Sequence, residues 1–503
     1  MLKRIVAVGL FAVLCHCADS YRGDVPPGDT GAVDGGPRDP TTTAPSPPAP
    51  SELTLAPLED VILSDQGAST SVPITITRSA PGPVTVTAAD LPAGVAVAPV
   101  TIGAGETTGT LVFALSSKPT LSPTTIRVTA ADAAGANATQ TSTLLVRGAP
   151  GTFDTSFGSG GSTSSLYGNE SVLAVDVAPL GARGYELLAD KTSSILSQLS
   201  LRGVIAAPVS LGFVGSGAIA AQGGKVLVGG IDTDRSIFVR RYSPEGALDA
   251  TFAAGGLALG TAPARSDGAV RDFLVGPDGA LVLYRTADGG YIDGFSFDGA
   301  ATSRVRVSST PENNPLSFGR VGDGVVSFLS ALGGARYFVQ TITAGGTGTV
   351  SNTRIDANDP LDATPPLPRG ATGAGRAYLP FSRRGSVTSA TSLIAAPAGE
   401  APVIATLDTS TGQPAATVVQ ADGKIIVAYA DGRSVNVVRY VSEGGTRDAT
   451  FGTNGMITLS FRQSAKDVGR IRIYALPENR LLAFVNTSDA NDRTIPSFCR
   501  LWL

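Results

Sequence analysis

Apolar and polar residues alternate in short runs along most of the chain beyond residue 51. SVPITITRS at 71–79, TTGTLVFALS at 107–116 and TTIRVTAAD at 124–132 are examples. A two-residue period places successive side chains on opposite faces of a strand. Glycine and proline are frequent between these runs, and long segments with a helical period are few. The pattern predicts an all-β protein.

Residues 52–147 contain about seven such runs, separated by turn residues at the spacing of a β-sandwich. The segments LPAGVAV and TIGAGETTGTLVF resemble bacterial immunoglobulin-like surface modules. The Cys–Trp–Cys core of antibody domains is missing, so the resemblance concerns the architecture. We therefore expect an immunoglobulin-like β-sandwich in this region.

Residues 148–503 repeat. The clearest units are 222–260 and 420–460, each with three strands, the third ending in Arg-Tyr, then a turn and a fourth strand. Weaker copies recur at a period of about 40–60 residues. Four-stranded units stacked radially at this period form a β-propeller. Seven blades fit the units best, with six or eight as alternatives, because the units near 311–411 are poorly marked.

The two ends of the repeat region complement each other. The last unit stops at SFCRLWL, which aligns with the third strand of the other units, so its fourth strand is missing. The phrase TFDTSFGSGG at 152–161 precedes the first unit. The three strands that precede this phrase in the other units are missing before it. We predict that this N-terminal strand completes the last blade and closes the ring, which removes a free sheet edge.

One phrase occurs three times with the same spacing. Its copies are Asp154, Phe157 and Gly161; Asp249, Phe252 and Gly256; and Asp448, Phe451 and Gly455. An Asp in a turn accepts backbone N–H groups, a Phe buried between blades contributes about 1.5–3 kcal/mol, and a Gly permits positive φ. Metal binding is the functional alternative, but one carboxylate per turn makes a poor calcium site. We expect a structural role.

The two clearest units also resemble the delta-60 repeat of secreted and surface proteins of Gram-negative bacteria. That family combines a Q-x-D-G-K-I turn, an R-Y strand and a D-x-x-F-G-x-x-G turn. The matching residues in one unit are Gln420, Asp422, Gly423, Lys424, Arg439, Tyr440, Asp448, Phe451, Gly452 and Gly455. The resemblance implies a propeller, and because the family has no assigned activity it implies no chemistry.

The N-terminus indicates export. Lys3 and Arg4 precede an apolar run at 5–14, which is too short to span a bilayer comfortably. Cys15 and Cys17 follow, and residues 1–17 resemble a bacterial lipoprotein signal. We predict lipidation at Cys17 or Cys15. Ordinary signal cleavage is the alternative, since the small residue that usually precedes such a cysteine is missing.

Residues 18–51 have no apolar period and are rich in Pro, Gly, Asp and Thr. Such a segment buries too little surface to offset the entropy of ordering, so we expect a disordered, flexible tether. A signal followed by a tether suits an outer-membrane lipoprotein of the cell envelope or an extracellular protein. Contact with the membrane is then expected only through the N-terminal lipid.

The amino-acid composition limits the partners and the catalytic mechanisms that the chain can have. The net charge is -4 and no basic patch stands out, which argues against nucleic acid as a partner. The only histidine, His16, lies in the signal region, so a mature chain has no Ser-His-Asp or Cys-His mechanism and no histidine-ligated metal site. Cys499 is expected as a buried thiol and Trp502 as a core residue. We expect no enzyme activity and no cofactor.

Two acidic loops are weak candidates for calcium. The first carries Asp356, Asp359 and Asp362, and the second Asp489 and Asp492. Neither has the glycine that a calcium-binding loop requires at its sixth position. Solvated turn residues are the simpler interpretation.

These features together predict a non-enzymatic secreted or membrane-anchored surface protein whose propeller binds an envelope or extracellular protein or glycan. The long segment 352–375 is the first loop to test, because irregular stretches of that length are often functional. A lyase or hydrolase that uses carboxylates and arginines in the propeller channel is one alternative. It requires Asp, Arg and Tyr side chains from three or more blades to converge. A purely structural envelope module is the other.

Overall fold

The computed structural model describes most of the chain beyond residue 51. The described residues are 52–503 except 59, 64–68, 117–122, 165–172, 181–182, 190–193, 201, 213–216, 233–235, 264–268, 277, 309–312, 322–323, 332–335, 343–350, 357–368, 385–388, 398–399, 409–411, 433, 461–466 and 489–493. Among them every regular element is a β-strand, as the alternating pattern predicts. None of them forms a helix long and apolar enough to cross a membrane.

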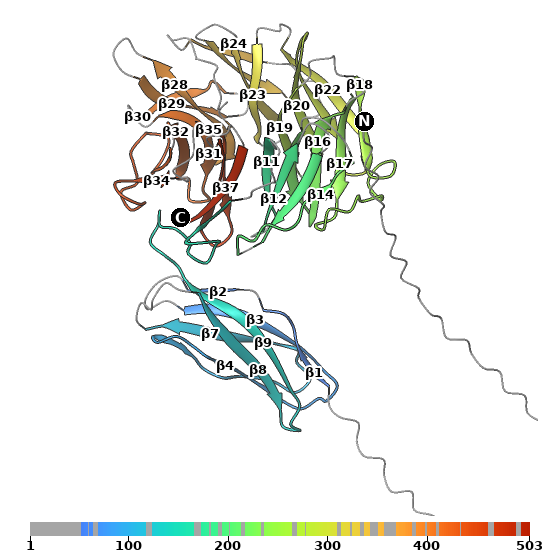
Figure 1. Cartoon of the computed structure of the whole chain (residues 1–503), viewed down its shortest axis with the longest axis vertical. Helices are drawn as coiled ribbons and strands as arrows, with labels where there is room; N and C mark the ends of the chain where they lie inside the picture. The colour runs from blue at the N-terminus through green and yellow to red at the C-terminus, as the bar shows by residue number, and fades with distance from the viewer. Residues whose placement is uncertain are drawn as a thin grey trace, which may run out of the picture. The chain divides into compact units, whose positions relative to one another are not determined.

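The N-terminal strands form two sheets around one core (Figure 1). The four-stranded sheet has the order β1 (Leu53–Leu55), β3 (Ser69–Arg78), β7 (Thr108–Leu115), β5 (Val95–Val97). The five-stranded sheet has the order β2 (Val61–Leu63), β9 (Asn137–Val146), β8 (Thr124–Asp132), β4 (Val84–Ala89), β6 (Val100–Ile102). Alternate residues point inward, so that Ile74 and Phe113 from one sheet and Val86 and Ile126 from the other share the core.

Seven four-stranded antiparallel sheets follow in the described residues, and we number them 1 to 7. Sheets 1 to 4 are β11 (Leu173–Leu180), β12 (Arg183–Ala189), β13 (Ser194–Leu199), β14 (Val209–Ser210); β15 (Gly217–Gln222), β16 (Lys225–Ile231), β17 (Ser236–Tyr242), β18 (Leu257–Pro263); β19 (Ala269–Gly276), β20 (Gly279–Thr286), β21 (Gly289–Phe295), β22 (Ala301–Ser308); and β23 (Asn313–Val321), β24 (Gly324–Ala331), β25 (Arg336–Ile342), β26 (Ser351–Asp356).

Sheets 5 and 6 are β27 (Ala371–Gly373), β28 (Arg376–Arg384), β29 (Ser389–Pro397), β30 (Val403–Asp408); and β31 (Gln413–Val419), β32 (Ile425–Asp431), β33 (Ser434–Tyr440), β34 (Met456–Ser460). Sheet 7 joins β35 (Asp467–Leu476), β36 (Arg480–Ser488) and β37 (Thr494–Trp502) to β10 (Ser162–Ser164), which comes from the other end of the region. Within sheets 1 to 6 consecutive strands pair as a meander, and in sheet 7 β10 pairs with β37.

The first strands of the sheets lie along the inner side of the array (Figure 1). Each contacts the first strand of the next sheet, from β11 through β15, β19 and β23 to β27, β31 and β35, and β35 in turn contacts β11. A cyclic array of four-stranded meanders is the architecture of a β-propeller. Hydrophobic residues fill the spaces between neighbouring sheets.

The ends of the array are joined by strand pairing. Ser162 lies opposite Cys499 and Ser164 opposite Ser497 in the β10–β37 ladder. Earlier in the same segment, the Asp154 N–H donates to the Arg500 carbonyl at 2.8 Å. The N-terminal segment therefore supplies the outer strand that the last unit lacks, as the phase of the repeats predicts.

The phenylalanine of the repeated phrase is buried at a junction between sheets in each copy. Phe157 packs with Val177 of sheet 1 and Phe498 of sheet 7, where the two ends of the ring meet. Phe252 packs against Phe273 of the following sheet. The residue after the phenylalanine then hydrogen bonds to that next sheet's last turn, as Gly158 N does to the Arg202 carbonyl at 2.8 Å and Ala253 N to the Asp298 carbonyl at 3.0 Å.

The last strand also carries the residues expected in the core. Cys499 is a buried free thiol, and burial raises its pKa to about 12. Trp502 is buried as well, with the Arg480 guanidinium 5.1 Å from its ring. Both residues therefore lie in the core, as expected.

Phe157→Ala and Phe252→Ala test whether the ring is closed through β10. Both side chains are 1% exposed, and truncation of such a Phe costs about 3–5 kcal/mol in free energy of unfolding. We expect equal costs in urea unfolding followed by tryptophan fluorescence and circular dichroism, because both residues fill the same kind of junction. A cost below about 1 kcal/mol for Phe157→Ala, with a full cost for Phe252→Ala, would contradict closure.

Candidate functional site

The aspartate of the repeated phrase is the acceptor of a local hydrogen-bond network. The Thr450 N–H and hydroxyl both donate to Asp448 Oδ1, at 3.1 and 2.6 Å. Asp448 Oδ2 lies 3.0 Å from Arg439 Nη2 and 3.1 Å from Lys424 Nζ. The turn interaction agrees with the sequence prediction, whereas the two cations were not foreseen.

All three copies share this arrangement. The equivalent sets are Asp154 with Ser156, Arg500 and Arg480, and Asp249 with Thr251, Arg241 and Lys225. In each set the arginine comes from the third strand of the sheet and its guanidinium lies over the phenylalanine of the same phrase, 4.7–4.9 Å from the ring centre. We call this set the Arg–Asp–Phe unit.

The Arg–Asp–Phe unit has the geometry of a structural element. Its carboxylate already faces two cationic side chains, so a metal ion there would meet strong repulsion. Arg241 and Arg439 belong to the Arg-Tyr pair that ends the third strand of the repeated units. The sequence pattern predicts the strand, but it does not show that the arginine side chain turns towards the aspartate.

The glycine that ends each phrase has positive φ, as expected: 95° at Gly161, 91° at Gly256 and 81° at Gly455. A Cβ on Gly161 would lie 2.6 Å from Phe153 Cβ, and one on Gly455 would lie 2.8 Å from Arg447 Cβ. The turn therefore needs glycine for both its conformation and the close approach of its neighbour.

Several predicted residues lie outside the described part of the chain. Cys15, Cys17, Asp359, Asp362, Asp489 and Asp492 are among the residues not described, as are the signal, the tether and residues 357–368 of the segment 352–375. Asp356 ends β26, but its side chain is not described. Within the described residues, no three His, Cys, Asp or Glu side chains gather as metal ligands.

A second polar group lies where the first strands of the sheets meet. It consists of Asp176 on β11, Asp272 on β19, Ser317 on β23, Arg369 just before β27, and Arg470, Arg472 and Tyr474 on β35. We call it the inner-strand cluster. Asp176, Asp272 and Ser317 each follow a β-bulge in the pairing with the second strand. A bulge re-aims the next side chain, which places these three at equivalent positions.

Arg369 links most members of the cluster. Its Nη1 lies 3.2 Å from Asp176 Oδ1 and 3.0 Å from the Tyr474 hydroxyl, and its Nη2 lies 3.0 Å from Asp272 Oδ1. The backbone of Arg369 is anchored on β31, because its N–H donates to the Ala415 carbonyl at 2.9 Å. One arginine thus joins side chains from sheets 1, 3 and 7.

The rest of the cluster holds the carboxylates in place. Arg472 Nε donates to Asp176 Oδ1 at 3.2 Å, and the Ser317 hydroxyl donates to Asp272 Oδ2 at 2.7 Å. The Gly370 N–H donates to the Ser317 hydroxyl at 3.0 Å, and the Tyr474 hydroxyl donates to the carbonyl of Val177. The two aspartates are 2% and 5% exposed, so these contacts satisfy groups that water scarcely reaches.

The surroundings of Asp176 and Tyr474 shift their pKa values in opposite directions. Burial alone would raise the pKa of Asp176, but the charges of Arg369, Arg472 and Arg470 outweigh it and lower that pKa below its usual value. Burial raises the pKa of Tyr474 to about 12. At neutral pH the carboxylate is therefore ionised and the phenol is protonated.

Sequence analysis did not identify this cluster. Its members are spread from residue 176 to residue 474, and each looks like an isolated polar residue in a buried strand. The one partial signal was the segment 352–375, whose described C-terminal end carries Arg369. The enzyme alternative requires Asp, Arg and Tyr side chains from several sheets to converge. Asp176, Asp272 and Tyr474, from sheets 1, 3 and 7, lie within hydrogen-bonding distance of Arg369, so this requirement is met.

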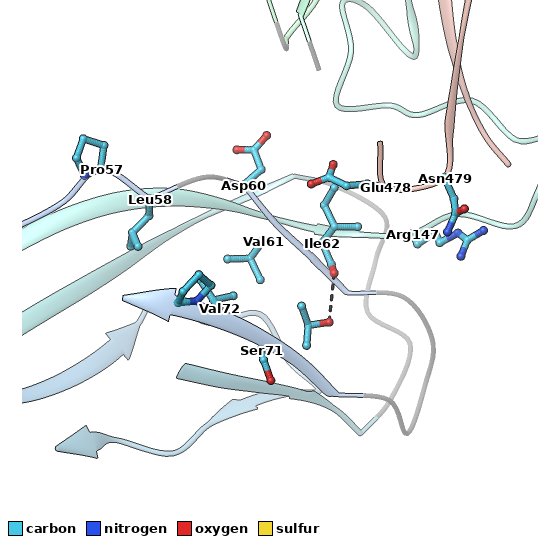
Figure 2. Close-up of a pocket in the computed structure, with 12 residues that line it drawn as sticks. Pro57, Leu58, Asp60, Val61, Ile62, Ser71, Val72, Arg147, Glu478 and Asn479 are labelled. Carbon is cyan, nitrogen blue, oxygen red and sulfur yellow. Dashed lines mark hydrogen bonds between the residues drawn. The ribbon is translucent and has the colours of Figure 1, made fainter. Parts of the chain in front are cut away.

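A cavity of about 470 Å³ lies against β2 and β3 of the N-terminal sheets (Figure 2). Most of its lining is apolar or uncharged, including Pro57, Leu58, Val72 and Thr70, whose hydroxyl donates to the Ile62 carbonyl at 3.3 Å. Its lining also includes charged side chains, Asp60 and Arg147 among them. The inner-strand cluster is the stronger candidate for specific recognition.

Comparisons with known proteins give structural likeness only. No protein-family profile matches the chain, and no curated protein sequence matches it. Among solved structures, it is similar to catalytically inactive virginiamycin B lyase from Staphylococcus aureus with quinupristin, at 11% identity and a TM-score of 0.41 over 67% of this chain and 98% of that one. It is also similar to YCF48 bound to D1 peptide, at 11% identity and 0.40 over 70% and 97%.

A third similar structure is regucalcin, a calcium-binding protein from Agrobacterium tumefaciens, with 16% identity and a TM-score of 0.35 over 67% of this chain and 94% of that one. According to their names, these three proteins differ in what they bind or in the reaction they catalyse. The function of this chain therefore has to be argued from its own residues.

The Arg–Asp–Phe unit predicts a pH dependence. Burial raises the pKa of Asp448, but hydrogen bonds from Thr450 and the charges of Lys424 and Arg439 lower it from 3.8 to about 2. Its stabilisation is therefore present above about pH 4 and lost as the pH falls towards 2. We expect Asp448→Asn to lower the free energy of unfolding by about 1.5–3 kcal/mol at pH 7, and by progressively less below pH 4.

Urea unfolding from pH 7 to pH 2 measures this difference. The matched control is Asp422→Asn, because that half-exposed side chain pairs only with Lys424 and is expected to cost less than about 0.5 kcal/mol. A difference between wild type and Asp448→Asn that stays constant down to pH 2 would rule out the proposed ion pairing.

Arg369→Met tests the inner-strand cluster. The change leaves the buried Asp272 carboxylate without a cation, which costs about 3–5 kcal/mol in free energy of unfolding. Adding Asp272→Asn removes the unpaired charge, so we expect the double variant to recover part of the loss. Chemical denaturation of the single and double variants measures this coupling. Additive losses would show that the two side chains do not interact.

Proposed function

We propose that this chain is an exported, non-enzymatic binding protein that recognises an envelope or extracellular protein or glycan at the inner-strand cluster. The observation that supports it most is the convergence of Asp176, Asp272 and Tyr474 on Arg369 from three sheets. A few polar groups converging from several elements are typical of a site that fixes the orientation of a ligand.

The protonation states favour binding over catalysis. General acid–base catalysis works best with a group whose pKa lies near the operating pH. In this cluster the Asp176 pKa is lowered and the Tyr474 pKa is raised to about 12, so both are far from neutrality. Ionised and neutral hydrogen-bonding groups held in fixed states suit recognition of a ligand.

The proposed architecture presents this site away from a membrane. We take sheets 1 to 7 as seven blades closed by the N-terminal strand, and residues 52–147 as an immunoglobulin-like spacer. Residues 18–51 would be the tether and Cys17 or Cys15 the lipidated residue, which would locate the protein at the outer membrane. No cofactor belongs to this proposal, and calcium at the acidic loops stays a separate candidate.

An enzyme that uses the same cluster is the second candidate. The arrangement of carboxylate, guanidinium and phenol groups from three sheets favours it, since lyases and hydrolases can use carboxylates with electrostatic stabilisation by arginine. Such an enzyme requires turnover. A purely structural role for the cluster requires instead that no ligand binds.

Ligand binding can be measured with purified full-length protein on an array of neutral and acidic glycans and against fractionated envelope proteins. We expect a saturable ligand whose dissociation constant rises about tenfold (about 1.4 kcal/mol) in Tyr474→Phe. Tyr291→Phe is the matched control, because its hydroxyl contacts Asp288 in sheet 3, away from the cluster.

Each outcome separates the candidates. Equal binding by Tyr474→Phe and the control would place the ligand elsewhere. Release of a product during incubation, followed by mass spectrometry, would favour the enzyme. Absence of any ligand would favour the structural module.

A further inference from the structure

Arg470 differs from the other arginines of the inner-strand cluster. Arg369 and Arg472 each contact a buried carboxylate, whereas Arg470 makes no hydrogen bond or ion pair with any residue of the described chain. It lies in the bulge of β35, two residues before Arg472, and its side chain is half-buried. Arg470 lies on the same inner strand as Arg472 and Tyr474, so we count it with the inner-strand cluster.

The cluster is electrostatically unbalanced. Its described members include the guanidinium groups of Arg369, Arg470 and Arg472 and the carboxylates of Asp176 and Asp272. The two carboxylates are occupied by Arg369 and Arg472. Among these described side chains the positive charges exceed the carboxylates by one, and Arg470 is the arginine without a described partner.

This imbalance costs free energy in the unliganded protein. Burial and the charges of Arg472 and Arg369 lower the pKa of Arg470 to about 10, and Asp176 offsets this only in part. A desolvated cation among like charges is unfavourable unless an anion approaches it. The Arg470 side chain is only half-buried, so part of it is exposed.

We propose that Arg470 binds an anionic ligand group, and that this group is a carboxylate. The inference rests on the proposed binding function and specifies its chemistry. One excess positive charge matches one carboxylate, which would neutralise the cluster. The planar guanidinium fork also fits the two carboxylate oxygens in a bidentate pair.

This assignment has a consequence that a structural role would not have. Replacing Arg470 by Gln removes the unpaired charge and the repulsion from Arg472. We expect the thermal midpoint of the unliganded Arg470→Gln protein to equal or exceed that of wild type. The same variant should lose carboxylate binding, so that stability and binding change in opposite directions.

The experiment uses purified full-length protein and sodium glucuronate as the probe. Thermal unfolding is followed with glucuronate, with glucose as the uncharged match, and with sodium chloride at equal ionic strength. We expect glucuronate alone to raise the wild-type midpoint, since a ligand of the native state stabilises it by mass action. Calorimetric titration should show a dissociation constant at least tenfold weaker for Arg470→Gln (about 1.4 kcal/mol).

Two further variants keep the result interpretable. Arg470→Lys retains the charge without the planar fork, and we expect weakened but measurable binding. Arg127→Gln removes an exposed positive charge from β8, and we expect binding equal to wild type. A larger oligoglucuronate in the same titration distinguishes a sugar-borne carboxylate from a free one, because only the former gains affinity with length.

The outcomes that overturn the inference are specific. Equal stabilisation of wild type and Arg470→Gln would show nonspecific ion binding, and no effect of glucuronate beyond sodium chloride would exclude the site. Tighter binding of phosphate than of glucuronate would replace the carboxylate by a tetrahedral anion. If glycan or protein binding persists in Arg470→Gln, the inference fails while the proposed function stands. If glucuronate binds but no glycan or protein does, the inference stands and that function fails.

Discussion

The pairing of β10 with β37 is the interaction on which the rest of this structure depends. It joins segments more than three hundred residues apart and completes the sheet that the last unit leaves with three strands. With this pairing, Phe157 fills the junction between sheets 7 and 1 as Phe252 fills one between consecutive sheets. The closed ring then holds β35 against β11, which brings Arg472 to Asp176.

Arginine–carboxylate pairs occur in two different arrangements in this protein. In the Arg–Asp–Phe unit, the arginine, the carboxylate and the aromatic ring come from one sheet, and the arginine pairs with the carboxylate. In the inner-strand cluster, the partners come from different sheets, and no carboxylate of the described side chains pairs with Arg470. A cationic side chain without a carboxylate partner is one to which an anionic ligand group can bind.

The repeated Arg–Asp–Phe units and the inner-strand cluster lie in different parts of the sheets. The apolar contacts and the repeated turns lie between neighbouring sheets, where every copy does the same work. The residues without a repeat counterpart, above all Arg369 and Tyr474, lie where the inner strands meet. A ring of similar sheets can vary these positions while its junctions stay unchanged.

The sequence by itself determined the strands, the repeats, the pairing of the chain ends and the burial of Phe157, Phe252 and Phe451. These features depend on local periodicity and on short phrases whose spacing is preserved. Only the tertiary structure showed that Asp176, Asp272, Arg369 and Tyr474 meet, and that Arg439 turns back onto Asp448. The reason is physical: closing the ring brings together residues from distant units, and the bulges that re-aim their side chains leave no periodic signal in the chain.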